Sequence, residues 1–311
     1  MKLDFVKGHM GGNRIVLLYG DQVPNKQELE VAKVLDPLYL SGHQLGILYP
    51  PKGEGNLSVK IVELSQEFLT ACGGLTQVLG KALIENKIGN HFGIKLQEPT
   101  TNVLLETDAG LTKIKIDITN KKVKRIVTSM DKFVEELYNT GVESIDLQGI
   151  KAMKVGKFFV LNGDKVKEKY PYVNFERMDE VTKNLLVKLQ KIFQKKTNLP
   201  NEDFALYDWN PIFSGDIRAV FPHSIPDGHI EPACGTGTVA IGLGCLESGE
   251  LKDNKDFQNG KIELQFETGG NLNLGGPDKT KLELFCEEEK LVKASFSHSL
   301  VELTASGVVY F

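Results

Sequence analysis

Short apolar runs rich in β-branched residues recur along the whole chain and predict β-strands. Glycine, asparagine and aspartate turns separate them, so the pattern favours antiparallel strands over strand–helix–strand units. The predicted strands are Arg14–Gly20, Val59–Leu64, Thr101–Asp108, Thr112–Thr119, Val123–Ser129, Lys157–Gly163, Ile217–Pro222, Lys261–Glu267, Lys281–Glu289 and Ser306–Phe311.

Helical periodicity is rarer and occurs in four places. Two of these segments begin directly after Cys72 and Cys234, and two more are Met130–Thr140 and Asp179–Lys196. In the last segment, five apolar residues fall on one helical stripe: Val181, Leu185, Leu186, Leu189 and Phe193. The mixture predicts an α+β fold in which sheets wrap a few helices, with little sign of a parallel sheet.

The two segments that begin at a cysteine are related to each other. Residues Ala71–Glu85, "ACGGLTQVLGKALIE", align without a gap on Ala233–Glu247, "ACGTGTVAIGLGCLE". Six positions are identical in the two segments: the leading alanine, the cysteine, the glycine after it, a threonine, a later glycine and the final glutamate. Because repeated segments usually mark repeated structure, the chain is expected to form two related domains with one cysteine each.

Composition excludes several classes of protein. Hydrophobic residues make up 41% and charged residues 25% of the 311 residues, which is ordinary for a globular protein of about two domains. A net charge of -4 gives no reason to expect a nucleic-acid partner. With neither a signal-peptide core nor an apolar segment of about 18 residues, we expect no membrane association and a cytoplasmic location.

Four cysteines occur without C-x-x-C spacing, which argues against a disulfide scaffold and a metal site. Cys72 and Cys234 are predicted at helix N-termini, where the helix dipole lowers the pKa of a thiol. Cys245 is predicted within a helix and Cys286 in a strand, so both are expected to be structural. The glycines after Cys72 and Cys234 leave first-turn N–H groups accessible to a carboxylate.

Two such termini facing each other would hold one carboxylate between two thiols. The thiols would then approach the bound carbon from opposite sides, which suits the removal of a proton from one face and its return to the other. Packing alone explains a single buried cysteine, but it does not require the same thiol at the same helix start twice. A phosphate-binding loop is disfavoured, because "PDGHIEPA" is no strand and the P-loop lysine is absent.

These motifs resemble those of the diaminopimelate epimerase and proline racemase superfamily, which acts without pyridoxal phosphate. "ACGTGT" is similar to the second cysteine motif of that family, and "ACGG" to the first. The resemblance implies two pseudo-symmetric domains, each a mostly antiparallel sheet around a central helix, with the active site in the cleft between them. The domains would be 1–132, joined by the returning strand 300–311, and 133–299.

The resemblance also implies substrate-binding residues. "KGHMGGNRI" is similar to the H-G-x-G-N segment of diaminopimelate epimerases, which maps their substrate asparagine to Asn13. "DWNPIF" and "FFVLNGDKV" point to Asn210 and Asn162. The backbone of the residues after each cysteine would bind the substrate carboxylate: Gly73, Gly74, Gly235 and Thr236.

The chain departs from the family pattern before its second cysteine. The stretch "FPHSIPDGHIEPA" lacks the arginine that diaminopimelate epimerases use, and "IEPACGTGT" is nearer to proline racemases. Glu231 is a candidate substrate residue there. His223 and His229 are either specificity residues or, as we favour, residues with a loop or surface role. Gly74 stands where an asparagine or histidine is usual.

The predicted function is racemisation or epimerisation of an amino acid by Cys72 and Cys234, with no cofactor and no metal. Isomerisation or dehydration of a small carboxylic acid on the same fold is the second hypothesis, and a non-catalytic ligand-binding protein is the third. The expected partner is a small amino acid, and a homodimer is left open.

Overall fold

The computed structural model describes residues 1–176, 179–198, 203–222, 230–251, 260–268, 278–288 and 290–310. The α-helices are α1 (Glu28–Val31), α2 (Gly73–Glu85), α3 (Ile88–His91), α4 (Asp131–Thr140), α5 (Gly163–Lys169), α6 (Glu180–Thr197) and α7 (Gly235–Glu247), with short 3-10 helices η1 (Gly20–Gln22) and η2 (Ala32–Leu35). The strands are β1 (Lys2–Met10), β2 (Asn13–Tyr19), β3 (Gln44–Tyr49), β4 (Leu57–Glu63), β5 (Phe68–Leu69), β6 (Thr100–Thr107), β7 (Gly110–Thr119), β8 (Lys122–Ser129), β9 (Val142–Leu147), β10 (Ile150–Val155), β11 (Phe158–Asn162), β12 (Asp203–Asp208), β13 (Ile217–Pro222), β14 (Ile230–Glu231), β15 (Lys261–Thr268), β16 (Lys279–Glu287), β17 (Lys290–His298) and β18 (Val301–Tyr310).

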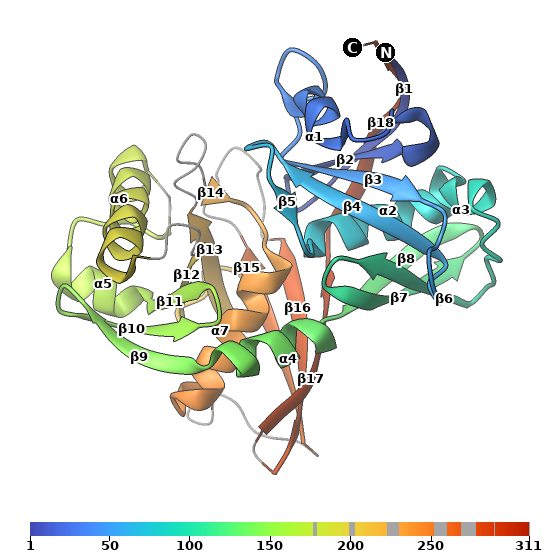
Figure 1. Ribbon diagram of the computed structural model, residues 1–311. Coiled ribbons are helices and arrows are strands. Elements are labelled where there is room, and N and C mark those ends of the chain that lie inside the picture. The colour runs from blue at the N-terminus through green and yellow to red at the C-terminus, as the bar shows by residue number, and fades with distance from the viewer. Residues whose placement is uncertain are drawn as a thin grey trace. The chain divides into compact units, whose positions relative to one another are not determined.

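The α+β class predicted from the sequence is confirmed. Each of the ten predicted strands overlaps a strand of the structure, and the four predicted helices are α2, α4, α6 and α7 (Figure 1). The sequence did not predict the strands β1, β3, β5, β9, β10, β12, β14 and β17, nor the short helices α1, α3, α5, η1 and η2. In the described ranges, no helix combines the length and apolar character that crossing a membrane requires.

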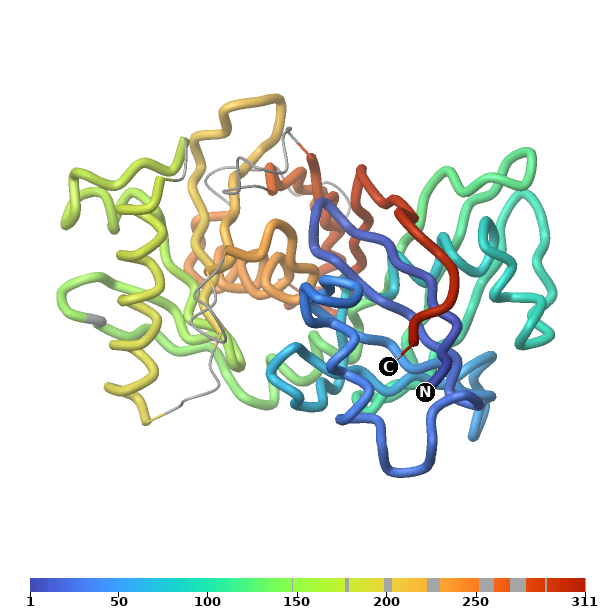
Figure 2. Tube along the Cα trace, turned by 90° about the horizontal axis from the view of Figure 1, so that it is seen from above, coloured from blue at the N-terminus to red at the C-terminus, as the bar shows by residue number. Residues whose placement is uncertain are grey.

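The chain divides into two compact units, Met1–Lys132 with Ser297–Phe311, and Phe133–Phe296. In the first unit, β1 pairs with both β2 and β18 in antiparallel fashion. The first and last strands therefore lie side by side, and Lys2, near the N-terminus, pairs with Tyr310, near the C-terminus (Figure 2).

The two units repeat one strand topology. In the first unit β2 pairs parallel with β3, β3 antiparallel with β4, β4 antiparallel with β5 and parallel with β6, and β6 antiparallel with β7. In the second unit β11, β12, β13, β14, β15 and β16 pair in the same order and the same directions. The helix that follows the two-residue strand is α2 in one unit and α7 in the other.

Parallel pairs are more prominent than the sequence predicted. The turn residues between predicted strands indicated antiparallel neighbours, but β4 reaches its parallel partner β6 only through α2, and β13 reaches β15 through α7. The inner strands of these pairs are buried along most of their length, as in β13, where all six residues are buried. Parallel strands covered on both faces lose the alternation that marks a half-exposed strand.

In each unit, a glutamate carboxylate at the equivalent position accepts three backbone hydrogen bonds. Glu106 accepts hydrogen bonds from the backbone N–H groups of Lys52, Gly53 and Gly55 at 2.7, 2.7 and 2.9 Å. Glu267 accepts the corresponding bonds from the segment 212–215, at 2.7 to 2.9 Å. These bonds close the turn that joins two antiparallel strands, so the repeat seen at the cysteines extends through both sheets.

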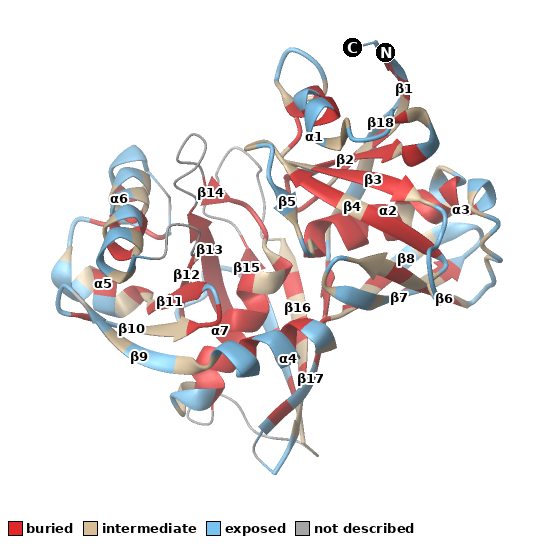
Figure 3. Ribbon diagram, in the orientation of Figure 1, coloured by how far each residue is buried: buried red, intermediate tan, exposed pale blue. Residues whose placement is uncertain are grey.

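The repeated helices are the buried centres of their units (Figure 3). α2 contacts β1, β2, β7, β8 and β18, and α7 contacts β10, β11, β12 and β16. Both helices carry a glycine where a strand approaches closely. A Cβ on Gly80 would lie 2.9 Å from Ile126 Cγ2, and one on Gly242 would lie 2.7 Å from Leu282 Cδ2. The glycine shared by both cysteine segments therefore serves helix–sheet packing.

One buried histidine couples the stability of the first unit to pH. His298 is 8% exposed, and burial lowers the pKa of its imidazole from 6.5 to about 4. Its Nδ1 lies 3.0 Å from both the N and the O of Leu300, so burial of the ring, rather than one hydrogen bond, favours the neutral imidazole over the protonated one. The unfolded chain gains this proton near pH 6.5 and the folded chain only near pH 4. Stability from the neutral imidazole is therefore complete above pH 6.5 and is lost as the pH falls.

We expect the free energy of unfolding to drop between pH 7 and pH 5 by about 2 kcal/mol because of His298. Replacement His298→Asn keeps an acceptor and removes the titration, so that part of the drop should disappear in urea unfolding at the two pH values. His91→Asn, at an exposed histidine, is the control and should keep the drop. An unchanged pH dependence in His298→Asn would contradict the assignment.

Candidate active site

Cys72 caps the N-terminus of α2. Its backbone is extended, with φ -147° and ψ 115°, and its sulfur accepts the backbone N–H of Leu75 at 3.4 Å. Cys72 is partly buried, whereas the first four residues of the helix are buried. A side chain at this position normally satisfies one of the N–H groups that cannot pair within the helix. Here that side chain is a thiol.

Cys234 caps α7 in the same way. Its backbone has φ -130° and ψ 114°, and its sulfur accepts the backbone N–H of Gly237 at 3.4 Å. A threonine three or four residues into each helix closes the turn: Thr76 Oγ1 donates to Gly73 O, and Thr238 Oγ1 donates to Cys234 O. The predicted placement of both thiols at helix starts is the geometry that the structure shows.

The first turns of α2 and α7 offer anion-binding donors beside each sulfur. The cap position pairs only the third N–H of each helix with sulfur, and the N–H groups before it have no partner within the helix. They belong to Gly73 and Gly74 in α2 and to Gly235 and Thr236 in α7. Together with the positive end of the helix dipole, these donors suit a carboxylate.

Gly235 and Gly237 are fixed by aromatic neighbours. A Cβ on Gly235 would lie 2.7 Å from Phe296 Cζ, and one on Gly237 would lie 2.6 Å from Phe221 Cε1. Both rings belong to buried residues. The glycines of "CGTGT" therefore allow two rings to pack against the first turn of the helix.

Asn13 reaches the first turn of α2 from a tight hairpin. β1 and β2 are joined by Gly11 and Gly12, with φ 54° and 94°, and Met10 pairs with Asn13 across the turn. Positive φ at both turn positions is what a two-residue hairpin loop requires, which explains the paired glycines. Asn13 is 1% exposed, and its Nδ2 lies 3.3 Å from the position that a Cβ on Gly74 would occupy. The structure thus brings Asn13 and the Cys72 helix start together.

The equivalent position beside Cys234 holds a hydroxyl group. Gly74 and Thr236 occupy the same place in the repeat, and Thr236 Oγ1 lies 3.3 Å from Cys234 Sγ. The thiol of Cys72 therefore has an amide side chain near its helix start, and the thiol of Cys234 has a threonine hydroxyl. The two half-sites share a backbone design and differ in side chains.

The prediction of a lowered thiol pKa is wrong for Cys234. Burial raises its pKa well above the usual value of 9.0, and the charge of Glu231 raises it further. Hydrogen bonds from Thr236 and Gly237 act in the opposite direction but are the smaller effect. Desolvation disfavours a thiolate more than one helix terminus favours it. Cys234 is therefore a thiol at neutral pH.

The charge of Glu231 is one cause that raises the pKa of Cys234, and its predicted contact with substrate stays a prediction. Glu231 ends β14, opposite Phe221, and is 6% exposed. His223 and His229 lie outside the described residues.

Asn162 is not brought together with Cys234. It caps α5 by accepting the N–H of Asp164 at 2.9 Å, and its Nδ2 lies 3.3 Å from Glu250 Oε2. Glu250 follows the C-terminal end of α7, whereas Cys234 precedes its first residue. Thirteen residues of helix span about 20 Å. The structure therefore places Asn162 at the opposite end of α7.

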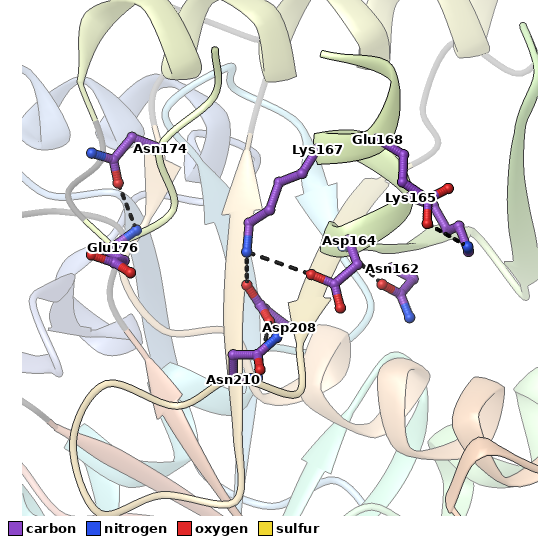
Figure 4. Close-up of polar contacts among 9 residues, drawn as sticks. All are labelled: Asn162, Asp164, Lys165, Lys167, Glu168, Asn174, Glu176, Asp208 and Asn210. Atoms are coloured by element: carbon purple, nitrogen blue, oxygen red, sulfur yellow. Dashed lines mark hydrogen bonds and ion pairs between the residues drawn. The ribbon is translucent and has the colours of Figure 1, made fainter. Parts of the chain in front are cut away.

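Asn210 lies at the same end as Asn162. It follows β12, whose Tyr207 pairs with Asn162, and both its backbone N and its Nδ2 donate to Asp208 Oδ1 at 2.9 and 2.8 Å. Lys167 Nζ donates to the other oxygen of Asp208 at 2.6 Å (Figure 4). Although burial acts to raise the pKa of Asp208, these bonds hold it below its usual value. Asn210 therefore supports a buried ion pair.

Charged and polar residues at the starts of the parallel strands were missed. His43 N donates to Arg14 O at 2.8 Å, and Asp203 N donates to Lys157 O at 2.9 Å, so in each unit such a bond joins the starts of two parallel strands. Lys157 Nζ also lies 3.2 Å from Asp203 Oδ2. After burial and Glu231, the charge of Asp203 is a further cause that raises the pKa of Cys234, which places this pair toward that thiol.

Gln44 is a second residue that was not predicted. Its Oε1 is buried and has no hydrogen-bond partner among the described residues. A buried acceptor without a donor is costly unless a ligand or water supplies one. Gln44 follows His43 directly and pairs with Ile15 in the parallel register, two residues beyond Asn13. A comparison of the glycine turns "MGGNRIV" and "KVGKFFV" could have directed attention to these strand starts.

No group of three or more histidine, cysteine, aspartate or glutamate side chains arranged to hold a metal ion occurs in the part of the chain that the structure describes. Cys245 is 1% exposed in the middle of α7, and Cys286 lies in β16, as predicted.

Comparisons with known proteins agree with this arrangement. Diaminopimelate epimerase of Bacillus subtilis is 22% identical over 302 residues, which cover 90% of this chain and 96% of the relative. A hydroxyproline epimerase from Agrobacterium vitis, solved with bound trans-4-OH-L-proline, superimposes with a TM-score of 0.68 at 15% identity, over 99% of this chain and 91% of the other. A methylitaconate-delta-isomerase superimposes with a TM-score of 0.63 at 15% identity, over 99% and 95% of the two chains. No protein-family model matches the chain.

The chain has the diaminopimelate epimerase-like fold. The resemblance predicted from the two cysteine motifs is therefore confirmed. The relatives named above are epimerases and an isomerase, and the isomerase class predicted from the sequence is the class that they share.

Replacement of Glu231 by glutamine should lower the pKa of Cys234. A carboxylate near the sulfur disfavours the thiolate, so removing its charge makes the thiolate form at lower pH. The measurement is the pH dependence of iodoacetamide alkylation at the Cys234 peptide, followed by mass spectrometry. Glu247→Gln, at the far end of α7, should leave the profile unchanged. A Glu231→Gln profile that matches the wild type would contradict the electrostatic role.

Proposed function

We propose that this protein is an amino-acid racemase or epimerase that inverts the α-carbon with two cysteines and without pyridoxal phosphate. The observation that carries the proposal is the repeated thiol cap. Cys72 and Cys234 occupy the same position in two copies of one fold, each beside unpaired N–H groups of a glycine-containing first turn. Helix capping needs only a serine, threonine, aspartate or asparagine. A thiol at both places is instead explained by a role in proton transfer.

The proposed reaction needs one base and one acid. A thiolate on one face of the substrate removes the α-proton, and the thiol on the other face donates its own proton to the same carbon. The configuration is inverted. The first sulfur has gained the α-proton, and the second has lost its own proton to the carbon. Because the pKa of Cys234 is raised, the resting enzyme holds that residue as the thiol. Cys72 would be the base in one direction of the reaction, and the two residues would exchange these roles in the reverse direction.

The first-turn N–H groups of both helices would bind the substrate carboxylate. A carboxylate held by backbone donors and helix dipoles withdraws electron density from the α-carbon and stabilises the enolate-like charge that develops there. Gly73, Gly74, Gly235 and Thr236 supply these donors. Asn13, near the start of α2, and Gln44, on the neighbouring strand, would orient the substrate. Asn162 and Asn210 lie away from Cys234 and have structural partners.

The relatives support an amino acid as the substrate class. The Bacillus subtilis relative is a diaminopimelate epimerase, and the hydroxyproline epimerase carries a bound amino acid in its solved structure. The missing arginine before the second cysteine argues against diaminopimelate itself.

The function can be tested with pooled L-amino acids in D₂O, without added cofactor, followed by chiral separation and mass analysis. We expect one amino acid to gain deuterium at its α-carbon and to appear as its D-isomer. The purified protein should show no pyridoxal absorbance. A requirement for added pyridoxal phosphate would contradict the proposal.

The cysteine variants Cys72→Ala and Cys234→Ala should each lose racemase activity by about 1,000-fold, because each direction needs an acid as well as a base. Cys286→Ala, in β16, is the matched control and should retain activity. Racemisation that survives in both single variants would remove these thiols from the mechanism. Double-bond migration in itaconate-like acids, with no exchange in any amino acid, would instead favour an isomerase like the methylitaconate relative.

A further inference from the structure

His43 lies between Asn13 and Arg14, within the first unit. Its Nδ1 is 3.1 Å from Asn13 Oδ1 and 3.3 Å from Arg14 N, and its Nε2 is 2.9 Å from Arg14 Nη2. His43 was not singled out from the sequence, and the motif that pointed to Asn13 does not include it. It stands directly before β3, beside the start of β2, because β2 and β3 pair in parallel.

These contacts decide which ring nitrogen carries the proton. The guanidinium of Arg14 has only donors and remains charged, so Nε2 at 2.9 Å must accept a hydrogen bond. A neutral imidazole whose Nε2 accepts carries its proton on Nδ1. Nδ1 then donates to Asn13 Oδ1 at 3.1 Å. The N–H of Arg14 also faces Nδ1, at 3.3 Å, and would need an unprotonated Nδ1, but this contact is longer and uncharged, so the charge-assisted bond at Nε2 decides the tautomer.

The bond from His43 Nδ1 decides the orientation of the Asn13 amide. Because its oxygen accepts from His43, its NH₂ group is the end that lies against Gly74, 3.3 Å from the position of a Cβ. A donor in that place adds to the N–H groups of the first turn of α2. With the amide reversed, an acceptor oxygen would point there and would repel a carboxylate.

We infer that His43 is a positioning residue that holds the Asn13 NH₂ group as a carboxylate donor beside Cys72. The inference rests on the proposed function for the identity of the substrate, but not for the orientation of the amide. Arg14 fixes the tautomer of His43, His43 fixes the amide of Asn13, and Asn13 completes the set of donors at the helix start.

Two replacements of His43 distinguish the role of its Nδ1 donor from the packing of its imidazole ring. His43→Asn places an amide NH₂ near the position of Nδ1 and can still donate to Asn13 Oδ1. His43→Gln places its amide near the position of Nε2 and loses that donor. A general packing role would make the two variants similar, whereas positioning makes His43→Asn the better one.

A chemical probe reads the donor set without any turnover. Iodoacetate carries a carboxylate next to the carbon that a thiol attacks, and iodoacetamide is its neutral counterpart. Hydrogen-bond donors beside Cys72 should bind the carboxylate of iodoacetate and speed its reaction there. Because both reagents react with the same thiolate, the ratio of the two alkylation rates does not depend on the thiolate content. We expect His43→Gln to lower this ratio by about tenfold, the effect of one hydrogen bond to a charged group. His43→Asn should keep it within about threefold.

The ratio at Cys286, in the same samples, is the internal control and should not change. An unchanged Cys72 ratio in His43→Gln, or equal losses in both variants, would overturn the inference. If a variant fails to fold, nitrogen-15 NMR of the wild-type protein still decides the tautomer. Protonated Nδ1 with bare Nε2 is expected for His43, and the opposite tautomer would overturn the inference.

Steady-state kinetics of the His43 variants test the inference together with the proposed function, and they show which of the two has failed. If the protein racemises an amino acid, His43→Gln should lower kcat/KM for it more than His43→Asn does, because the donor binds the carboxylate in the substrate and its enolate-like charge in the transition state. Equal losses of kcat/KM in the two variants would contradict positioning of the Asn13 donor. If no amino acid is turned over, the proposed function fails, and the alkylation ratio and the tautomer still test His43.

Discussion

The structure depends on one constraint at two places: the N–H groups in the first turn of a helix cannot pair within that helix. In α2 and α7 a cysteine sulfur accepts the third of these groups, and the first two groups have no partner within the helix. Each helix is the buried centre of its unit, so its N-terminus is fixed by the sheet around it. In each unit the thiol and the first-turn N–H groups beside it therefore belong to one buried helix start.

The repeat supplies two such elements, and their surroundings make them different. Asn13 and His43 approach the start of α2 through the parallel pair β2–β3. At α7 the corresponding strands bring Lys157 and Asp203, and Glu231 and burial raise the pKa of the Cys234 thiol. A pair of identical thiols would have no preferred protonation state. The surroundings of Cys234 favour its protonated form, through burial and the charge of Glu231.

Much of this could be predicted because it is local. The cysteine motifs repeat at a fixed offset, and the glycine turn before Asn13 is a hairpin signal. What failed depends on tertiary structure. Asn162 was chosen by its order in the chain, which does not reveal at which end of α7 it lies. Desolvation of Cys234 outweighs the helix dipole, and no sequence pattern reports desolvation. His43 and Gln44 carry no motif, and only the parallel register brings them beside Asn13.

The central claim is that two thiols act on opposite faces of one α-carbon, and isotope incorporation tests it most directly. The racemised amino acid is allowed to react in D₂O to low conversion, and deuterium is measured separately in both isomers. Two bases predict deuterium in the inverted product and almost none in the recovered substrate, because each face has its own thiol. Equal deuterium in both isomers would mean that a single base serves both faces, and it would contradict the claim.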